Sequence, residues 1–434
     1  MVYRKKKEKI SKRYIVVVLF FIGAYLDIPL QISKSVELPS ISNILLTMVL
    51  IPFIYKRYHK YDLNFLFFVF TIVLSSIIFA GNINYLGSLW IKIFQFILGI
   101  FTGITLLKVF AMCEIRKIEK IFFVISTVLL IGCFLEYVGL IRGLSDAFVN
   151  AVFKGGKYNI YDNADRDLEL TGFLRPRFFT TEPSLLSIGF MISTTVFLIV
   201  TKNTFKFNLS FLYSVVFLAI SGSPIVTLNI VIWVILFFKK SEGINAAKLV
   251  FVAVASLAIV LLPFSDFGTK MINKIQDRIL NQSKEEGTSS NARLFVGYNL
   301  ALPASASYNP IVGVGFAGRN ILAEITGHRG VDPNDKVSME FIEGANAFSR
   351  LFVYLGIVGG ICFFYVFKVY LQKHKIKNLW ILLIICSLFA QTFGTFETSR
   401  FWIYIFFIVG AFYLRSANTE KTITPINGNI HEKI

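Results

Sequence analysis

Long apolar runs recur along the whole chain, and they constrain its fold more than any other feature. A transmembrane helix needs about 20 mainly apolar residues, and it must satisfy its own backbone polar groups. Here 55% of the 434 residues are hydrophobic, and 46 are phenylalanine. We interpret the runs as twelve spans: 14–31, 40–55, 63–80, 88–108, 121–141, 179–200, 207–221, 223–238, 248–263, 347–367, 379–393 and 401–414. The sequence therefore predicts an all-α polytopic membrane protein.

Basic residues are distributed unevenly between the connections that join these spans. The net charge of +18 could suggest a nucleic-acid partner. Instead, Lys and Arg gather in alternate connections, at 4–13, 56–60, 108–120, 202–206, 239–240 and 368–377, and after residue 415. The opposite short connections contain only Lys34 and Arg400. Because cytoplasmic loops carry such an excess, we expect both termini to be cytoplasmic and expect no nucleic-acid partner.

Two long connections divide the chain into five regions. Helices one to five occupy 1–141, a first outside loop follows at 142–178, and helices six to nine occupy 179–263. A larger outside loop at 264–346 leads into the last three helices and a cytoplasmic tail at 347–434. The first loop contains an acidic run at 162–169, and the second begins with an amphipathic helix pattern over 267–279. The four cysteines lie in or beside the spans, so their positions predict neither a disulfide framework nor a metal site.

The first loop ends in a polar motif at the start of an apolar run. Residues 175–184 place Arg175, Arg177, Glu182 and Ser184 beside the predicted membrane surface. Planar guanidinium groups bind phosphate and pyrophosphate through two parallel hydrogen bonds. The motif therefore indicates a phosphate or pyrophosphate ligand. The alternative is that both arginines only anchor the helix end by snorkelling.

Further charged residues lie on the predicted outer side, around the second long loop. They are Arg293, Arg319, Glu340, Glu343, Asn346 and Arg350. Arg350 lies about one turn inside an apolar run, where a charge is costly and marks a candidate functional residue. It either contacts a ligand or forms an ion pair with Glu182 or Glu343. His328 is the only histidine on this side, and we expect it in a surface turn.

Four motifs, in this order, resemble the bacterial O-antigen polymerase and O-antigen ligase superfamily, the Wzy and WaaL types, over roughly residues 170–400. They are Arg175 seven residues before Glu182-Pro183-Ser184, then Asn291-Ala292-Arg293, Gly313-Val314-Gly315, and Ala345-Asn346-Ala347-Phe348. Two positions depart from the family pattern. Ligases carry a histidine where this chain has Ala345, which favours the polymerase branch. Phe178 replaces a residue that is often small.

The resemblance implies a GT-C-like membrane glycosyltransferase that acts at the outer face of the bacterial cytoplasmic (inner) membrane. It would transfer a growing glycan from undecaprenyl pyrophosphate to a sugar hydroxyl of one lipid-linked repeat unit, with inversion, and so build O-antigen lipopolysaccharide or capsule. A groove between spans would admit the polyprenyl tail among the membrane lipids. A chain-length regulator is a possible partner. The alternatives are an O-antigen ligase and a polysaccharide flippase or secondary transporter, although no internal repeat is evident.

The site prediction assigns a role to each candidate residue. Arginines stabilise the pyrophosphate leaving group, so no cofactor and no metal ion are expected. A carboxylate accepts the proton of the acceptor hydroxyl. Among Glu182, Glu340 and Glu343, we prefer Glu343 for this role. The predicted catalytic residues are Glu343, Arg293 and Arg175, and the predicted substrate-binding residues are Arg177, Glu182, Ser184, Arg319, Asn346 and Arg350.

Overall fold

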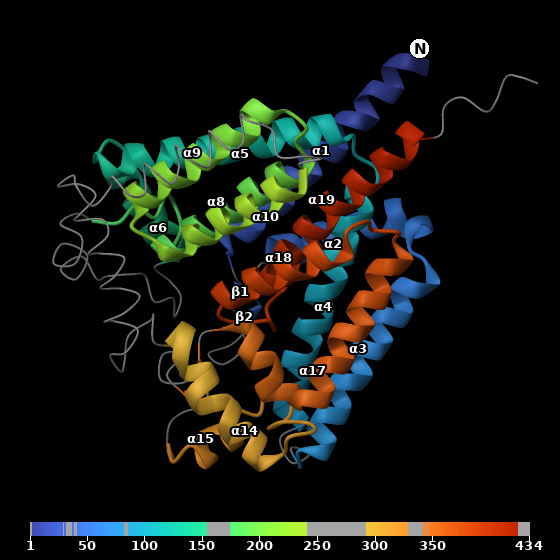
Figure 1. Cartoon of the computed structure of the whole chain (residues 1–434), viewed down its shortest axis with the longest axis vertical. Coiled ribbons are helices and arrows are strands. Elements are labelled where there is room, and N and C mark those ends of the chain that lie inside the picture. The colour runs from blue at the N-terminus through green and yellow to red at the C-terminus, as the bar shows by residue number, and fades with distance from the viewer. Residues whose placement is uncertain are drawn as a thin grey trace, which may run out of the picture.

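The described part of the chain is almost entirely helical. The computed structural model describes residues 2–28, 30–31, 37–38, 41–81, 86–153, 174–240, 292–328, 342–344 and 346–423. Within these ranges the only strands are β1 (Leu30–Gln31) and β2 (Glu37–Leu38), which pair antiparallel. Figure 1 shows the remaining elements as a bundle of long helices with shorter helices at one end. The predicted all-α polytopic membrane fold is confirmed.

The long helices overlap the predicted spans, except that the first helix ends at Leu26 and strand β1 occupies Leu30–Gln31 of the predicted span 14–31. They are α1 (Val2–Leu26), α2 (Ile41–Ile54), α3 (Lys60–Phe79), α4 (Leu86–Phe110), α5 (Ile115–Tyr137), α8 (Pro183–Val200), α9 (Thr204–Ser221), α10 (Thr227–Lys240), α17 (Ala347–Lys373), α18 (Leu379–Thr392) and α19 (Ser399–Ile423). Within the described ranges, seven helices are long and apolar enough to cross a membrane: α3, α4, α5, α8, α9, α17 and α19. Helices α10 and α18 are shorter and also apolar. The predicted span at 248–263 lies outside the described residues.

Shorter elements lie in the connections. They are η1 (Tyr55–Arg57), α6 (Arg142–Phe153), η3 (Pro224–Val226), the π-helix η6 (Ala292–Ala301), α14 (Leu302–Tyr308) and α15 (Arg319–Ile325). The acidic run at 162–169 and the amphipathic pattern over 267–279 lie outside the described residues. The five-region division of the chain stays a prediction.

Helices α4, α8 and α19 form the centre of the bundle. In α8, 89% of the apolar window is buried inside the protein, compared with 33% in α3, α5 and α9. Large apolar side chains such as Phe67 and Phe68 on α3 and Phe134 on α5 are exposed on the outer helices. Exposed apolar surface of this extent matches a lipid environment and would be unfavourable in water. The bundle therefore has a packed interior and a lipid-compatible exterior.

The elements that carry the predicted site lie away from the first residues of the chain. In Figure 1 the start of α1 and the end of α19 lie at the upper right, whereas α6, α14 and α15 lie at the left and bottom. This arrangement agrees with the uneven distribution of basic residues, which places both termini on one side and the long loops on the other. The assignment of the terminal side to the cytoplasm stays a prediction.

Candidate functional site

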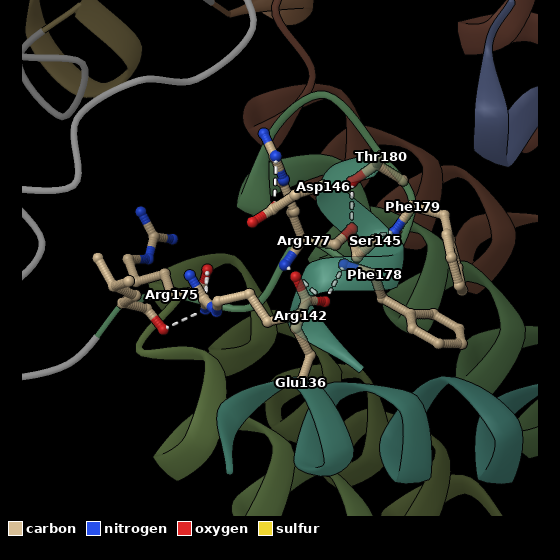
Figure 2. Close-up of polar contacts among 10 residues, drawn as sticks. Glu136, Arg142, Ser145, Asp146, Arg175, Arg177, Phe178, Phe179 and Thr180 are labelled. Carbon is tan, nitrogen blue, oxygen red and sulfur yellow. Dashed lines mark hydrogen bonds and ion pairs between the residues drawn. The ribbon is translucent and has the colours of Figure 1, made fainter. Parts of the chain in front are cut away.

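The backbone of residues 174–182, here called the arginine loop, is fixed by hydrogen bonds to α5 and α6 (Figure 2). Glu136 of α5 accepts hydrogen bonds from the backbone N–H of Arg177, at 3.2 Å, and of Phe178. Ser145 of α6 accepts one from the N–H of Phe179, at 3.0 Å. A buried carboxylate that accepts two adjacent N–H groups holds the loop in one conformation. Neither Glu136 nor Ser145 was among the residues predicted from the sequence.

Two phenylalanines in the arginine loop adopt left-handed backbone conformations. Phe178 has φ of 40° and Phe179 has φ of 65°, and such conformations cost non-glycine residues about 1–3 kcal/mol each. The ring of Phe178 is accommodated by Gly132 of α5, where an added Cβ would lie 2.3 Å from that ring. The carbonyl of Phe178 accepts a hydrogen bond from Tyr25, at 2.7 Å. The chain therefore accepts Phe178 in place of a small residue because α5 provides the space.

The polar side chains of the motif have partners within the protein. Arg177 Nη2 lies 2.6 Å from Asp146 Oδ1 of α6, and Arg175 Nε donates to the carbonyl of Ser221 at the end of α9, at 3.2 Å. Glu182 precedes α8, and its side chain makes no capping hydrogen bond there.

Two further side chains complete the motif. Ser184 Oγ donates to Glu182 Oε2, at 2.8 Å. Arg142 donates to the carbonyls of Leu174 and Arg175, at 2.8 and 3.3 Å, so a third arginine supports the loop.

A second group of charges surrounds Glu343, and we call it the Glu343 cluster. Glu343 Oε1 lies 3.0 Å from Arg319 Nη2 and 3.3 Å from Arg350 Nη2. Tyr354 donates a hydrogen bond to Glu343 Oε2. The side chains of Glu343 and Arg350 are 1% exposed, whereas that of Arg319 is 17% exposed. The ion pair between Arg350 and Glu343, one of the two predicted environments for Arg350, is confirmed.

The start of α17 is positioned by Asn346. Its side-chain oxygen accepts hydrogen bonds from the N–H groups of Phe348 and Ser349, at 2.9 and 3.0 Å, which makes Asn346 the N-cap of the helix. Its amide nitrogen donates a hydrogen bond to Oε1 of Gln391 in α18, at 2.6 Å. The hydroxyl of Tyr298 in η6 donates to the same Gln391 oxygen. Asn346 therefore aligns α17, α18 and η6 around the Glu343 cluster.

The predicted glycine motif delivers Arg319 to the cluster. Val314 donates to the carbonyl of Val353 in α17, at 3.0 Å, where the helix is kinked at Gly356. Gly313 and Gly356 both have positive φ, at 63° and 68°, and a Cβ on either would come within 2.2 Å of a carbonyl oxygen on the other segment. Only glycine permits this close approach. The approach brings the loop beside α17 and places Arg319 at the start of α15.

Two more charged residues interact with the cluster. Lys92 of α4 interacts electrostatically with Arg319, Glu343 and Glu397. Glu397, in the connection between α18 and α19, interacts with Arg350, Glu343 and Arg319. The group therefore contains three cations and two carboxylates. Neither residue was predicted from the sequence, although a lysine inside the apolar run 88–108 indicates a functional position.

The two carboxylates of the group differ in their acidity. Burial raises the pKa of Glu343, but the charges of Arg319 and Arg350 outweigh burial and hold that pKa below its usual value. Burial also raises the pKa of Glu397, and there the nearby arginines do not outweigh it. Glu343 is therefore ionised and paired, whereas Glu397 binds a proton more readily.

The remaining predicted residues are placed as follows. The backbone of Arg293 lies in η6, whereas Glu340 and Ala345 are outside the described residues. His328 is exposed and lies 3.2 Å from Thr326 Oγ1, in the expected surface turn. Among the described residues, no group of three or more His, Cys, Asp or Glu is placed to hold a metal ion. The structure thus brings together Arg319, Glu343 and Arg350, and it places Arg175, Arg177, Glu182 and Ser184 in the separate arginine loop.

The fold and site define a polytopic helical membrane protein with a buried arginine–carboxylate cluster beside its loop-bearing end. A family model described as O-antigen ligase matches residues 207–364, which include the glycine motif and the three central residues of the Glu343 cluster. The match supports the O-antigen ligase and polymerase superfamily that the sequence resembles, and it does not distinguish the two branches. No curated protein matches the chain.

Proposed function

We propose that the protein polymerises oligosaccharide repeat units that are linked to polyprenyl pyrophosphate, by inverting glycosyl transfer. The observation that carries this proposal is the excess of positive charge among the described residues of the Glu343 cluster, where the three cations Lys92, Arg319 and Arg350 interact with the two carboxylates Glu343 and Glu397. A buried site with surplus cations is stabilised by an anionic ligand. The family match supports a membrane enzyme that acts on lipid-linked glycans.

In this proposal the arginines stabilise the leaving group. As the bond between sugar C1 and pyrophosphate breaks, negative charge develops on the pyrophosphate oxygen, and guanidinium groups at fixed positions stabilise that charge. Arg319 is the side chain best placed for this role, because it pairs with Glu343 and is still 17% exposed. Glu343 then orients Arg319 and Arg350. Its earlier assignment as proton acceptor stays a prediction, which the two ion pairs and the lowered pKa disfavour.

An apolar pocket beside the cluster supports a lipid-linked substrate. It lies between α17, α18 and α19 and has a cavity volume of about 50 Å³, so it has room for a short apolar segment and not for a whole ligand of the usual size. Its lining begins at Ala347 and Phe348, next to the cap residue Asn346, and continues along the helices to Phe367 and Trp402. We propose that this pocket holds part of the prenyl chain while the pyrophosphate contacts the arginines.

The arginine loop completes the proposed site on the extracytoplasmic face of the inner membrane. Arg175 and Arg293 are proposed to contact the pyrophosphate groups, and Arg177 is proposed to bind substrate after exchanging its Asp146 partner for the ligand. Glu182 and Ser184 are proposed to contact the sugars. The second candidate, an O-antigen ligase, has the same family support. The polymerase is preferred because Ala345 stands where ligases carry a histidine.

Deletion of the gene in its host tests this function directly. The surface polysaccharide is then resolved on a gel. Collapse of the ladder to a single repeat unit on the acceptor supports the polymerase. Complete loss of attached glycan, with polymer retained on the lipid carrier, indicates a ligase. Loss of the lipid-linked intermediate from the outer face indicates a flippase.

A further inference from the structure

Glu397 is a carboxylate whose position the packing of the bundle does not explain. It lies in the short connection between the end of α18 at Thr392 and the start of α19 at Ser399. Its Oε2 atom is shielded from solvent and has no hydrogen-bond partner within the described part of the chain. Arg400, the nearest cation along the chain, is paired with Asp27 at 3.1 Å. A buried polar atom without a partner is costly, and in native proteins it often marks a functional group.

Packing holds this connection against the Glu343 cluster. The N–H of Ala347, the first residue of α17, donates to the carbonyl of Phe393, at 2.6 Å. The ring of Phe396 contacts the rings of Tyr354 and Phe316, with centroid distances of 6.2 and 6.1 Å. Tyr354 is the residue that donates to Glu343. The residue before Glu397 is therefore packed against the cluster, and the carboxylate of Glu397 interacts electrostatically with it.

The two carboxylates of the site have different surroundings. Glu343 Oε1 forms ion pairs with Arg319 and Arg350, and Oε2 accepts a hydrogen bond from Tyr354, so two cations compensate the charge of Glu343. Glu397 retains an oxygen without a donor. Enzymes that use two carboxylates separate their roles in this way, with one group kept ionised as an electrostatic partner and the other free to exchange a proton. The raised pKa of Glu397, caused first by burial, agrees with that second role.

We propose that Glu397 is the general base that accepts the proton of the acceptor sugar hydroxyl. The inference rests on the proposed polymerase function. In the reaction the O–H bond of the acceptor breaks, and its proton moves to the carboxylate of Glu397, whose side chain is partly exposed. The acceptor oxygen forms a bond to C1 of the donor sugar. The bond between C1 and pyrophosphate breaks, and its electron pair remains on the pyrophosphate oxygen, opposite the arginines.

Glu182 and the outer histidine are less suitable. Glu182 Oε2 accepts a hydrogen bond from Ser184 in the separate arginine loop. His328 is exposed beside Thr326 in a surface turn. Glu397 therefore takes the role of general base, for which this chain has no histidine at position 345.

The test compares Glu397→Gln with Glu114→Gln in the purified full-length protein, using a lipid-linked repeat unit as substrate. Glu114 is an exposed carboxylate paired with Lys117, so its variant controls for the loss of one charge. We expect Glu397→Gln to lower the turnover number by roughly 10²–10⁴-fold, the usual effect of losing a general base. Binding of polyprenyl pyrophosphate and the elution volume in size-exclusion chromatography should not change. Turnover within about twofold of wild type would overturn the proposal.

The pH profile distinguishes a base from a structural residue. The charged groups that face Glu397 are Lys92, Arg319, Arg350 and Glu343. Because Glu397 must be ionised to accept a proton, the wild-type rate should rise with pH through the pKa of Glu397. This rise should disappear in Glu397→Gln. If that variant does not fold, Glu397→Asp replaces it, with a lower rate and a shifted rise expected; an unshifted rise contradicts the proposal.

The outcomes separate this inference from the function on which it rests. If the wild-type protein forms no polymer from the repeat unit, the polymerase function is wrong. If it forms polymer that requires Arg319 and does not require Glu397, the function stands and only the assignment of the base is wrong.

Discussion

The charge of Glu343 is expected to stabilise the protein, because it compensates two arginines at once. Glu343→Gln would keep the size of the side chain and remove its charge. Arg350 is 1% exposed and would then remain buried without its direct ion-pair partner, with only the electrostatic interaction with Glu397 left, whereas Arg319 is 17% exposed and can turn toward solvent. Breaking a buried ion pair in this way costs about 3–5 kcal/mol. Because a glutamine oxygen still accepts hydrogen bonds, we expect the lower end, about 3 kcal/mol.

The assay is the unfolding free energy of the purified protein in detergent, measured for Glu343→Gln, Arg350→Met and the double variant. Removing both charges should restore part of the loss, since the uncompensated charge is then absent. A coupling free energy of about 1–3 kcal/mol is expected between the two positions. If Glu343→Gln unfolds within about 0.5 kcal/mol of wild type, the ion pairs do not hold the cluster together. Any loss of turnover in this variant would then mean that Glu343 takes part in the reaction itself and does not only hold the arginines in place.

Three further substitutions test the parts that position the arginines. Gly356→Ala should lower both stability and turnover, because a Cβ at this positive φ meets a carbonyl of the facing loop at 2.2 Å; normal activity would show that the docking of that loop is dispensable. Gly132→Ala should displace the ring of Phe178, because an added Cβ would lie 2.3 Å from that ring. This variant should raise the Michaelis constant for the lipid-linked substrate. An unchanged Michaelis constant would show that the arginine loop does not contribute to substrate binding. Arg293→Ala should abolish polymer formation at normal expression, and Arg293→Lys should restore little, because a point charge lacks the planar fork of arginine; full activity in either variant would remove Arg293 from the site.

The sequence predicted the helices well because apolar length alone specifies a membrane span. Even the short helices α10 and α18 were predicted, because an apolar segment within a membrane must form a helix to satisfy its backbone hydrogen bonds. The pairing of Arg350 with Glu343 was one of two predicted environments, because both residues lie close to the start of one helix. Local spacing thus gave this ion pair as one alternative beside an ion pair with Glu182 and a ligand contact.

Other contacts depend on packing that the sequence does not encode locally. Arg319 reaches Glu343 only because Gly313 docks at the kink of α17 at Gly356. Glu397 interacts with the same cluster from the short connection between α18 and α19, and the sequence analysis gave it no role. Glu136 lies inside a predicted span, and a carboxylate at such a position indicates that polar groups pack against it. Its partners, the backbone N–H groups of Arg177 and Phe178, come from a distant loop. These positions required tertiary contacts between segments that are far apart in the chain.

The most direct test of the account is polymer synthesis by the purified protein in liposomes, with a lipid-linked repeat unit as the only glycan. Wild type and Arg116→Ala, which changes an exposed arginine distant in sequence from the site, should both produce a ladder of polymer. Arg319→Ala should fold, because Glu343 keeps Arg350 as its partner, and should lose roughly 10²–10³-fold in turnover, the usual effect of removing one group that stabilises developing charge. A wild-type ladder that Arg319→Ala reproduces at full rate would contradict the central claim that the cluster stabilises the pyrophosphate leaving group.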